Sequence, residues 1–251
     1  MRNRDLLLTG AVGPWRMRAI VFDYYGTLSN PAGESERRAL YARTGETLGI
    51  DGDVFWGAMV DTFRERIIGA YGDTRSTLSA IAGRCGVTAS DDLLAEAVRV
   101  QLAGARHTQR PRPDAVKTLT ALRERGFRLA LMSDCSSELV EDWPNNPFAP
   151  LIDAPVFSWR ERVRKPDPAL YAAATSRLFV SAAECWYVGD GGGRELRGAH
   201  DAGMRPVLVT NAAHPEAAQH RADPDEHIPD YTVDDLPELL DLVGSASRVD
   251  H

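Results

Sequence analysis

Short apolar runs alternate with helical patterns through the second half of the chain. The runs that predict strands are residues 127–132, 154–158, 185–188, 206–209 and 231–233. The segments that predict helices are residues 114–125, 168–178, 194–202 and 235–243. Strands that alternate with helices form a parallel sheet with helices on both faces. The sequence therefore predicts an α/β fold with a Rossmann-like parallel sheet.

One more apolar run, residues 19–22, lies near the start of the chain and ends on a carboxylate, Asp23. Gly26 then gives the backbone freedom for a turn, and Thr27 adds a hydroxyl. Open α/β sheets bind ligands at the carboxyl ends of their strands. Asp23 is therefore a candidate functional residue, although a simple loop acid also fits this run taken alone.

A long helical stretch separates this first strand from the others. It contains predicted helices over residues 34–48, 53–71, 77–84 and 91–103, with Asp53 and Ser90 as expected N-caps. We interpret residues 29–110 as a small all-helical insert. Residues 18–28 and 111–244 then form the α/β core, residues 1–17 a loose N-terminal extension and residues 245–251 a C-terminal tail.

Composition narrows the possible partners and compartments. The formal net charge of −7 argues against non-specific nucleic-acid binding, and an anionic substrate would need local compensation by cations. No apolar run approaches the length of a membrane span. The three cysteines form no Cys-x-x-Cys pair, so we expect a reducing, cytoplasmic compartment. Residues 1–16 resemble a signal peptide only weakly, and we expect Met17 to be the functional start.

Four of the predicted strands are followed by a polar side chain, either directly or in the next loop. These side chains are Asp23, Ser133, Lys165 and Asp190, with Glu195 five residues beyond Asp190. Because these ends lie along one edge of a parallel sheet, the side chains can converge. Together they supply a carboxylate nucleophile, a hydroxyl donor, a cation and an oxygen-rich cluster suited to Mg²⁺.

At this point the chain resembles the haloacid dehalogenase superfamily, from Arg18 to about Val243. The residues that carry the resemblance are Asp23–Leu28, Ser133, Lys165–Pro168, Gly189–Asp190 through Glu195, Gly198–Ala199 and Ala202–Met204. Each motif alone is weak, but four motifs in order at strand ends are a strong signal. The insert at residues 29–110 resembles the helical cap of this family, which closes over the site and selects substrate.

The resemblance implies a role for each matching residue. Asp23 would attack the substrate and become covalently modified, and Lys165 would hold Asp23 and the developing charge. Ser133 would bind the transferring group, and Thr27 would support the loop or the phosphoryl group. Mg²⁺ would be bound by Asp190 and Glu195, together with Asp23 and the backbone carbonyl of Tyr25. The implied activity is a phosphatase of a small phosphorylated metabolite.

Tyr25 departs from this pattern. Phosphatases of the family usually have Asp at this position, which protonates the leaving group and later activates water. The family's L-2-haloacid dehalogenases carry Tyr there and work without metal. We give more weight to Asp190 and Glu195, because an acidic pair makes electrostatic sense only with a cation. Tyr25 would be compatible with substrates that have a good leaving group, such as acyl phosphates or activated aryl phosphates. A dehalogenase, or a weakly active binding or regulatory protein, remains an alternative.

Several other features have simpler interpretations. Gly191–Gly193 fails the dinucleotide spacing and suggests a turn in the metal loop. Arg160, Arg162 and Arg164 suggest a solvated loop paired with Glu161, and Cys135 a small buried side chain. The histidines show no ligand spacing, and we expect them at the surface. Asp134, directly after Ser133, adds a negative charge without an evident role. The sequence gives no indication of oligomeric state.

Overall fold

A computed structural model describes residues 17–215 and 221–246 of the chain. The predicted N-terminal extension lies outside the described residues except for Met17, as does the predicted tail from residue 247 onward. The first two residues of that tail belong to the last helix, Leu239–Ala246, so this helix begins and ends later than the predicted helix over residues 235–243.

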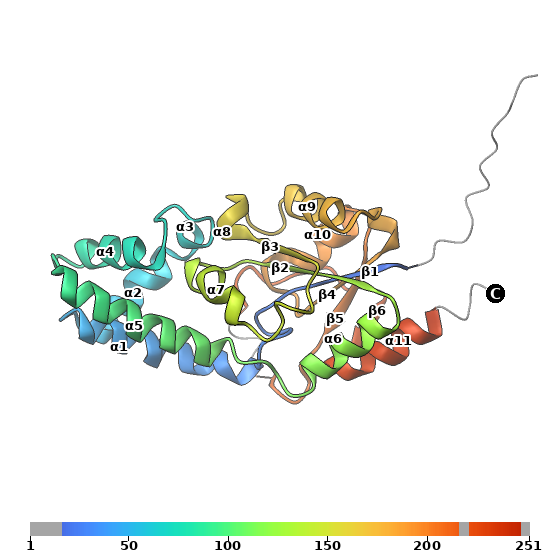
Figure 1. Ribbon diagram of the computed structural model, residues 1–251, viewed down its shortest axis with the longest axis horizontal. Helices are drawn as coiled ribbons and strands as arrows, with labels where there is room; N and C mark the ends of the chain where they lie inside the picture. Colours follow the sequence, from blue (N-terminus) through green and yellow to red (C-terminus); the bar gives the residue numbers. More distant parts are fainter. Residues whose placement is uncertain (1–16, 216–220, 247–251) are drawn as a thin grey trace, which may run out of the picture.

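Six parallel strands form one sheet in the order β3-β2-β1-β4-β5-β6 (Figure 1). Their bounds are β1 Ala19–Phe22, β2 Arg128–Ser133, β3 Ala154–Phe157, β4 Cys185–Gly189, β5 Arg205–Val209 and β6 Tyr231–Val233. The predicted parallel α/β sheet is confirmed, and each strand lies within about two residues of its predicted bounds.

The first strand lies at the centre of the sheet and is buried along its whole length. Its register places Phe22 beside Leu131 of β2 and Val188 of β4. The backbone N–H of Asp23 then donates to the carbonyl of Val188 at 2.9 Å. This bond fixes Asp23 against the end of β4, because a parallel ladder aligns the carboxyl ends of neighbouring strands.

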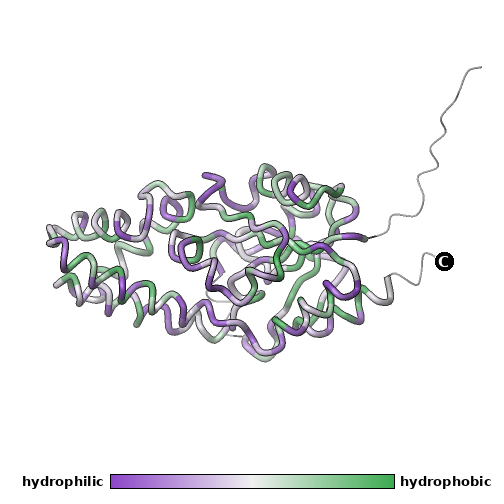
Figure 2. Tube along the Cα trace, viewed as in Figure 1, coloured by the Kyte–Doolittle hydropathy of each residue, from purple (hydrophilic) through white to green (hydrophobic). Residues whose placement is uncertain are grey.

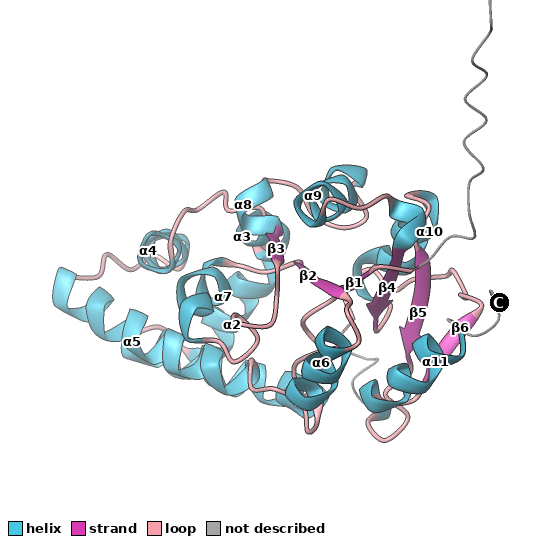
Figure 3. Ribbon diagram, turned by 45° about the vertical axis from the view of Figure 1, so that its right-hand side comes forward, coloured by secondary structure: helices cyan, strands magenta, loops and turns pink. Residues whose placement is uncertain are grey.

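Helices cover both faces of the sheet (Figures 1 and 3). On one face, α9 (Pro168–Leu178) and α10 (Glu195–Asp201) pack against Val21 and Ala130. On the other, α6 (Ala115–Glu124) and α11 (Leu239–Ala246) pack against Ile20 and Leu129. Successive strand residues therefore point into different cores, as the period of two requires.

Five α-helices lie between β1 and α6, preceded by a 3₁₀ turn at Pro31–Glu36. They are α1 Arg37–Thr47, α2 Gly52–Asp61, α3 Phe63–Ile67, α4 Thr74–Arg84 and α5 Asp91–Thr108. These helices bury a separate apolar cluster that includes Phe55, Met59 and Ile81. Green and purple residues alternate along α5 in Figure 2, as expected for a helix with one buried face. We keep the name helical insert for residues 29–110.

The long helix predicted over 53–71 is wrong, because the structure has two helices with a break at Thr62. The Thr62 hydroxyl donates to the carbonyl of Ala58 at 2.7 Å, and such side-chain bonds compete with the helix backbone. The N-cap is Asp51 rather than Asp53, since its carboxylate accepts from the N–H groups of Asp53 and Val54. The Ser90 cap is confirmed by its bond from the Leu93 N–H.

The structure contains two short helices that the sequence did not predict. One is α8 (Ser158–Glu161), which begins directly after β3, and the other is α7 (Ser137–Asp142), which follows β2. A 3₁₀ turn, Leu236–Glu238, also precedes α11. None of the helices in the described ranges combines the length and apolar character needed to cross a membrane.

Gly198 in α10 gives a stability prediction. A Cβ at this position would lie 2.6 Å from Cζ of Tyr171 and 2.9 Å from Cβ of Pro166, so a side chain would overpack the contact between α9 and α10. We expect Gly198→Ala to lower the free energy of unfolding by about 1–3 kcal/mol. Urea unfolding measures this change.

The matched control is Gly57→Ala, inside α2, where a Cβ would meet nothing within 4 Å. This variant should raise the free energy of unfolding by about 0.5–1 kcal/mol, because alanine loses less backbone entropy in a helix. Equal effects of the two substitutions would contradict the packing argument.

Candidate active site

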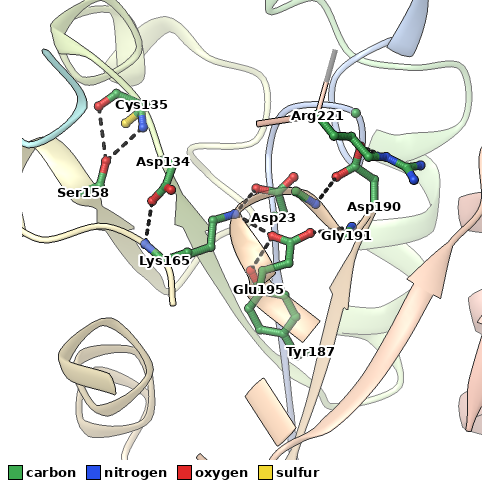
Figure 4. Close-up of polar contacts among 12 residues, drawn as sticks. Asp23, Asp134, Cys135, Ser158, Lys165, Tyr187, Asp190, Gly191, Glu195 and Arg221 are labelled. Atoms are coloured by element: carbon green, nitrogen blue, oxygen red, sulfur yellow. Dashed lines mark hydrogen bonds and ion pairs between the residues drawn. The ribbon is translucent and has the colours of Figure 1, made fainter. Parts of the chain in front are cut away.

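A buried lysine joins two of the predicted acids. The Lys165 ammonium donates to Oδ1 of Asp23 at 2.6 Å and to Oε2 of Glu195 at 2.5 Å (Figure 4). All three side chains are almost fully buried. The backbone N–H of Lys165 donates to Oδ1 of Asp134 at 3.0 Å, which fixes the start of the lysine side chain. Residues from three distant parts of the sequence therefore form one charged cluster.

Asp190 lies beside this pair. Asp23, Asp190 and Glu195 each offer one carboxylate oxygen, and these oxygens all lie within 4.8 Å of one another. The guanidinium of Arg221 donates to Oδ2 of Asp190 at 3.1 Å. Lys165 and Arg221 thus offset part of the charge of the three carboxylates at the carboxyl end of the sheet.

Glu195 is held in place from two sides. The hydroxyl of Tyr187 in β4 donates to its Oε2 at 2.9 Å, and the N–H of Gly191 donates to its Oε1 at 2.9 Å. Gly191 and Gly193 have φ angles of 92° and 64°, a backbone that favours glycine. The glycine run therefore forms the tight turn that the sequence predicts, and it aims Glu195 back at the strand ends.

Burial shapes the electrostatics of the cluster. Burial, followed by the charge of Asp23, raises the pKa values of Asp190 and Glu195 above the ordinary range for carboxyl groups. Burial lowers the pKa of Lys165, but Asp23 and Glu195 outweigh this, and the pKa ends well above its usual value. A further cation would relieve the repulsion among the acids. The donor set consists of carboxylate oxygens, which fits Mg²⁺.

The loop after β1 makes close contact with Asp190. Gly26 has a φ angle of 76°, and a Cβ there would lie 2.6 Å from Oδ2 of Asp190. The side-chain amide of Asn211, just after β5, donates to the carbonyl of Gly26 at 2.9 Å. Asn211 was not among the predicted site residues, although its polar side chain two residues after a predicted strand is a signal that could have identified it.

Tyr25 faces a cavity of about 120 Å³, which Asp23, Lys165, Asp190 and Glu195 also line. Its hydroxyl accepts from the amide of Gln109 at 3.0 Å, and the guanidinium of Arg37 lies 4.9 Å from its ring centroid. Burial raises the pKa of Tyr25, so the hydroxyl stays protonated near neutral pH. Both Arg37 and Gln109 come from the helical insert.

Ser133 and Thr27 are placed differently. Both are fully buried and do not belong to the lining of that cavity. Within residues 17–215 and 221–246, neither hydroxyl oxygen has a hydrogen-bond partner. A buried hydroxyl without a partner is costly. Their predicted contact with a substrate therefore stays a prediction.

The predicted pairing of the basic loop with Glu161 is wrong. Glu161 pairs with Arg177 at 2.7 Å, and Arg164 pairs with Asp223 at 2.9 Å. The guanidinium of Arg162 donates to the carbonyl of Ile68 at 3.3 Å and also contacts that of Gly69. The loop therefore binds the helical insert, a long-range contact that local charge spacing does not reveal.

The remaining predictions for side chains are simpler to assess. Cys135 is buried, as predicted, and burial raises the pKa of its thiol. His200 is exposed, in line with the expected surface position. His107 is half exposed and contacts Glu36.

Comparison with known proteins identifies the family. Residues 17–203 match the model of a family described as haloacid dehalogenase-like hydrolase. The chain therefore belongs to this family of hydrolases, as the sequence resemblance implied.

Two similar proteins are named as phosphatases. Glyceraldehyde 3-phosphate phosphatase of Methanopyrus kandleri is 29% identical over 92% of this chain and 99% of its own length. Phosphoserine phosphatase of Thermus thermophilus is 31% identical over 83% of this chain and 74% of its own length. A solved structure, 2-haloacid dehalogenase from Pseudomonas syringae, matches with a TM-score of 0.66 at 23% identity over 92% of this chain and 99% of that one. The last match shows the fold alone.

Removal of the Lys165 ammonium gives a prediction for stability. Lys165→Met leaves Asp23 and Glu195 buried without their partner, and we expect a loss of about 3–5 kcal/mol in the free energy of unfolding near neutral pH. Burial, followed by the charge of Asp23, raises the pKa of Glu195 to about 8, and without Lys165 this pKa rises further. The part of the loss that comes from ionisation of Glu195 should therefore grow as the pH rises above about 8. Urea unfolding in a metal chelator measures it.

Lys117→Met is the matched control, because Lys117 pairs with Asp114 on the exposed surface. This pair should contribute less than about 1 kcal/mol, with little pH dependence. A loss at Lys165 that is as small as that at Lys117 would contradict the proposed coupling.

Proposed function

We propose that this chain is a Mg²⁺-dependent phosphatase of a small phosphorylated metabolite that works through an aspartyl phosphate on Asp23. The observation that carries the proposal is the cluster of Asp23, Asp190 and Glu195 around Lys165, at the carboxyl end of the sheet. Two relatives named as phosphatases support it. A cluster of three buried acids suits an anionic substrate only when a cation offsets their charge.

Each residue has a defined task in this proposal. An oxygen of the Asp23 carboxylate attacks phosphorus, the bond to the leaving oxygen breaks, and water later cleaves the acyl phosphate. Lys165 orients Asp23 and offsets charge in the transition state. Ser133 and Thr27 bind the transferring phosphoryl group. Asp23, Asp190, Glu195 and the carbonyl of Tyr25 would hold Mg²⁺, which would neutralise charge on the phosphoryl oxygens.

The helical insert acts as a cap in this proposal, over a core of residues 18–28 and 111–244. Support comes from the cavity, because residues of the insert and residues of the strand ends line it together. Arg37 and Gln109 contact Tyr25 from the insert side. Side chains of the insert therefore meet the part of a substrate that lies beyond the phosphoryl group.

Tyr25 limits the leaving groups that the enzyme can handle. It faces the cavity where an acidic residue would donate a proton, yet burial raises its pKa. A group with so high a pKa is a weak general acid near neutral pH. Substrates with good leaving groups, such as acyl or aryl phosphates, should therefore react best unless the substrate itself supplies the proton.

The central test is phosphate release from acetyl phosphate and p-nitrophenyl phosphate. We expect turnover that requires Mg²⁺ and falls by roughly 10⁴-fold or more in Asp23→Asn, which removes the nucleophile. Asp61→Asn, at an exposed position in the insert, is the matched control and should keep full activity. Turnover that survives the loss of Asp23, or that ignores the metal, would refute the proposal.

Leaving-group dependence tests the role of Tyr25. Tyr25→Asp introduces an acid at the cavity and should raise turnover of alkyl phosphates relative to p-nitrophenyl phosphate by about 10²-fold or more. Tyr25→Phe keeps the ring and removes only the hydroxyl, so it should leave this ratio near that of the native protein. The ratio of kcat/KM values for the two substrates is the measurement. A large drop for alkyl phosphates in Tyr25→Phe would show that the hydroxyl is the proton donor.

A dehalogenase is the second candidate, because Tyr25 lines the cavity and stands where the family's L-2-haloacid dehalogenases carry Tyr. That reaction needs attack by Asp23 on carbon and loss of halide, with no proton for the leaving group. Chloride release from L-2-chloropropionate without metal, in the absence of phosphatase activity, would favour it. Absence of turnover with both substrate types would favour a binding or regulatory protein.

A further inference from the structure

Arg66 lies in α3, on the helical insert side of the cavity. Its side chain lines the cavity but is only 4% exposed. The guanidinium lies near two aromatic rings, 5.9 Å from the centroid of Tyr41 and 6.0 Å from that of Phe63. Arginine in such a setting is held in a defined orientation, because the rings restrict its movement.

The hydrogen bonds of Arg66 are incomplete. Nη2 donates to the carbonyl of Met59 at 2.8 Å, and Nη1 reaches Oγ of Ser136 at 3.3 Å. Nε is buried and has no partner among the described residues. A guanidinium carries five N–H donors, so most of its capacity is unused. Two other arginines of the cavity wall differ, because Arg164 pairs with Asp223 and Arg221 with Asp190.

Glu138 is linked to Arg66 through the hydroxyl of Ser136. The Ser136 hydroxyl donates to Oε2 of Glu138 at 2.6 Å, and the amide of Gln101 donates to Oε1 at 2.8 Å. Both carboxylate oxygens are thus engaged by neutral groups. Across the part of the chain that the structure describes, no carboxylate forms an ion pair with Arg66. Buried charges are normally paired, so a partner is missing.

We propose that Arg66 binds a carboxylate of the substrate, and that the substrate is therefore a small phosphorylated carboxylic acid. This inference rests on the proposed phosphatase function. Asp23 and Arg66 line the same cavity of about 120 Å³, so one small molecule bound there can contact both groups. The planar fork of a guanidinium matches a carboxylate in two parallel hydrogen bonds. Arg66 is in this view a specificity-determining residue, apart from the chemistry at Asp23.

The test compares pairs of substrates that differ by a carboxylate. Suitable pairs are phosphoserine with phosphoethanolamine, phosphoglycolate with ethyl phosphate, and phosphoglycerate with glycerol phosphate. For at least one pair, kcat/KM of the native protein should be roughly 10- to 100-fold higher with the carboxylated member. Arg66→Met should remove that preference and leave p-nitrophenyl phosphate turnover within about threefold. Arg66→Lys should restore only part of it, because an ammonium lacks the fork.

Arg99→Met is the matched control, since Arg99 is exposed on α5 and pairs with Glu96 of the same helix. This variant should keep the native preference. Equal loss of all substrates, including p-nitrophenyl phosphate, in Arg66→Met would show a purely structural role. Equal turnover of both members of every pair by the native protein would also overturn the inference.

A binding measurement separates this inference from the proposed reaction. Asp23→Asn holds a substrate without turning it over, so calorimetry gives the Kd of phosphoglycolate and of ethyl phosphate directly. Phosphoglycolate should bind roughly 10- to 100-fold more tightly, and Arg66→Met should abolish the difference. If p-nitrophenyl phosphate is not hydrolysed but this difference is seen, the phosphatase proposal fails and the carboxylate site stands. No difference in Kd would refute the site whatever the turnover.

Discussion

The ammonium of Lys165, held between Asp23 and Glu195, is the interaction on which the site depends. Three carboxylates come within 4.8 Å of one another inside the protein, and their mutual repulsion opposes folding. Lys165 offsets two of them directly, and Arg221 offsets Asp190. The two cations keep the three acids close together at the strand ends, where carboxylate oxygens suit a divalent cation.

The parallel sheet explains why these residues meet. Because β1 lies between β2 and β4, Asp23 is placed next to the ends of both neighbours. The glycine turn after β4 then sends Glu195 back towards Asp23, while the loop before α9 delivers Lys165 from the other side. The helical insert adds Arg66 and Gln109 to the lining of the cavity. In the proposed function, the strand ends supply the charged groups and the insert recognises the substrate.

Much of this could be predicted from sequence because it has a local signature. Alternating strand and helix patterns predicted the sheet, and polar residues at strand ends predicted that Asp23, Lys165, Asp190 and Glu195 converge. Contacts between residues distant in sequence had no such signature. The bonds of Arg66 with Ser136 and of Asn211 with Gly26 depend on how whole elements pack. The break at Thr62 was missed because the apolar spacing of Phe55, Met59 and Phe63 continues across it. The orientation of Tyr25 likewise depends on Gln109, at the far end of the insert.

A covalent intermediate on Asp23 is the central claim. Without an acid or base at the position of Tyr25, activation of water for the second step is weak, so the phosphorylated enzyme should accumulate. The most direct measurement is mass spectrometry of enzyme quenched in acid during turnover of acetyl phosphate with Mg²⁺. The account predicts a phosphoryl group on the peptide that contains Asp23, removed by hydroxylamine and absent in Asp23→Asn. Steady turnover with no modified Asp23, or with the phosphoryl group on another residue, would contradict it.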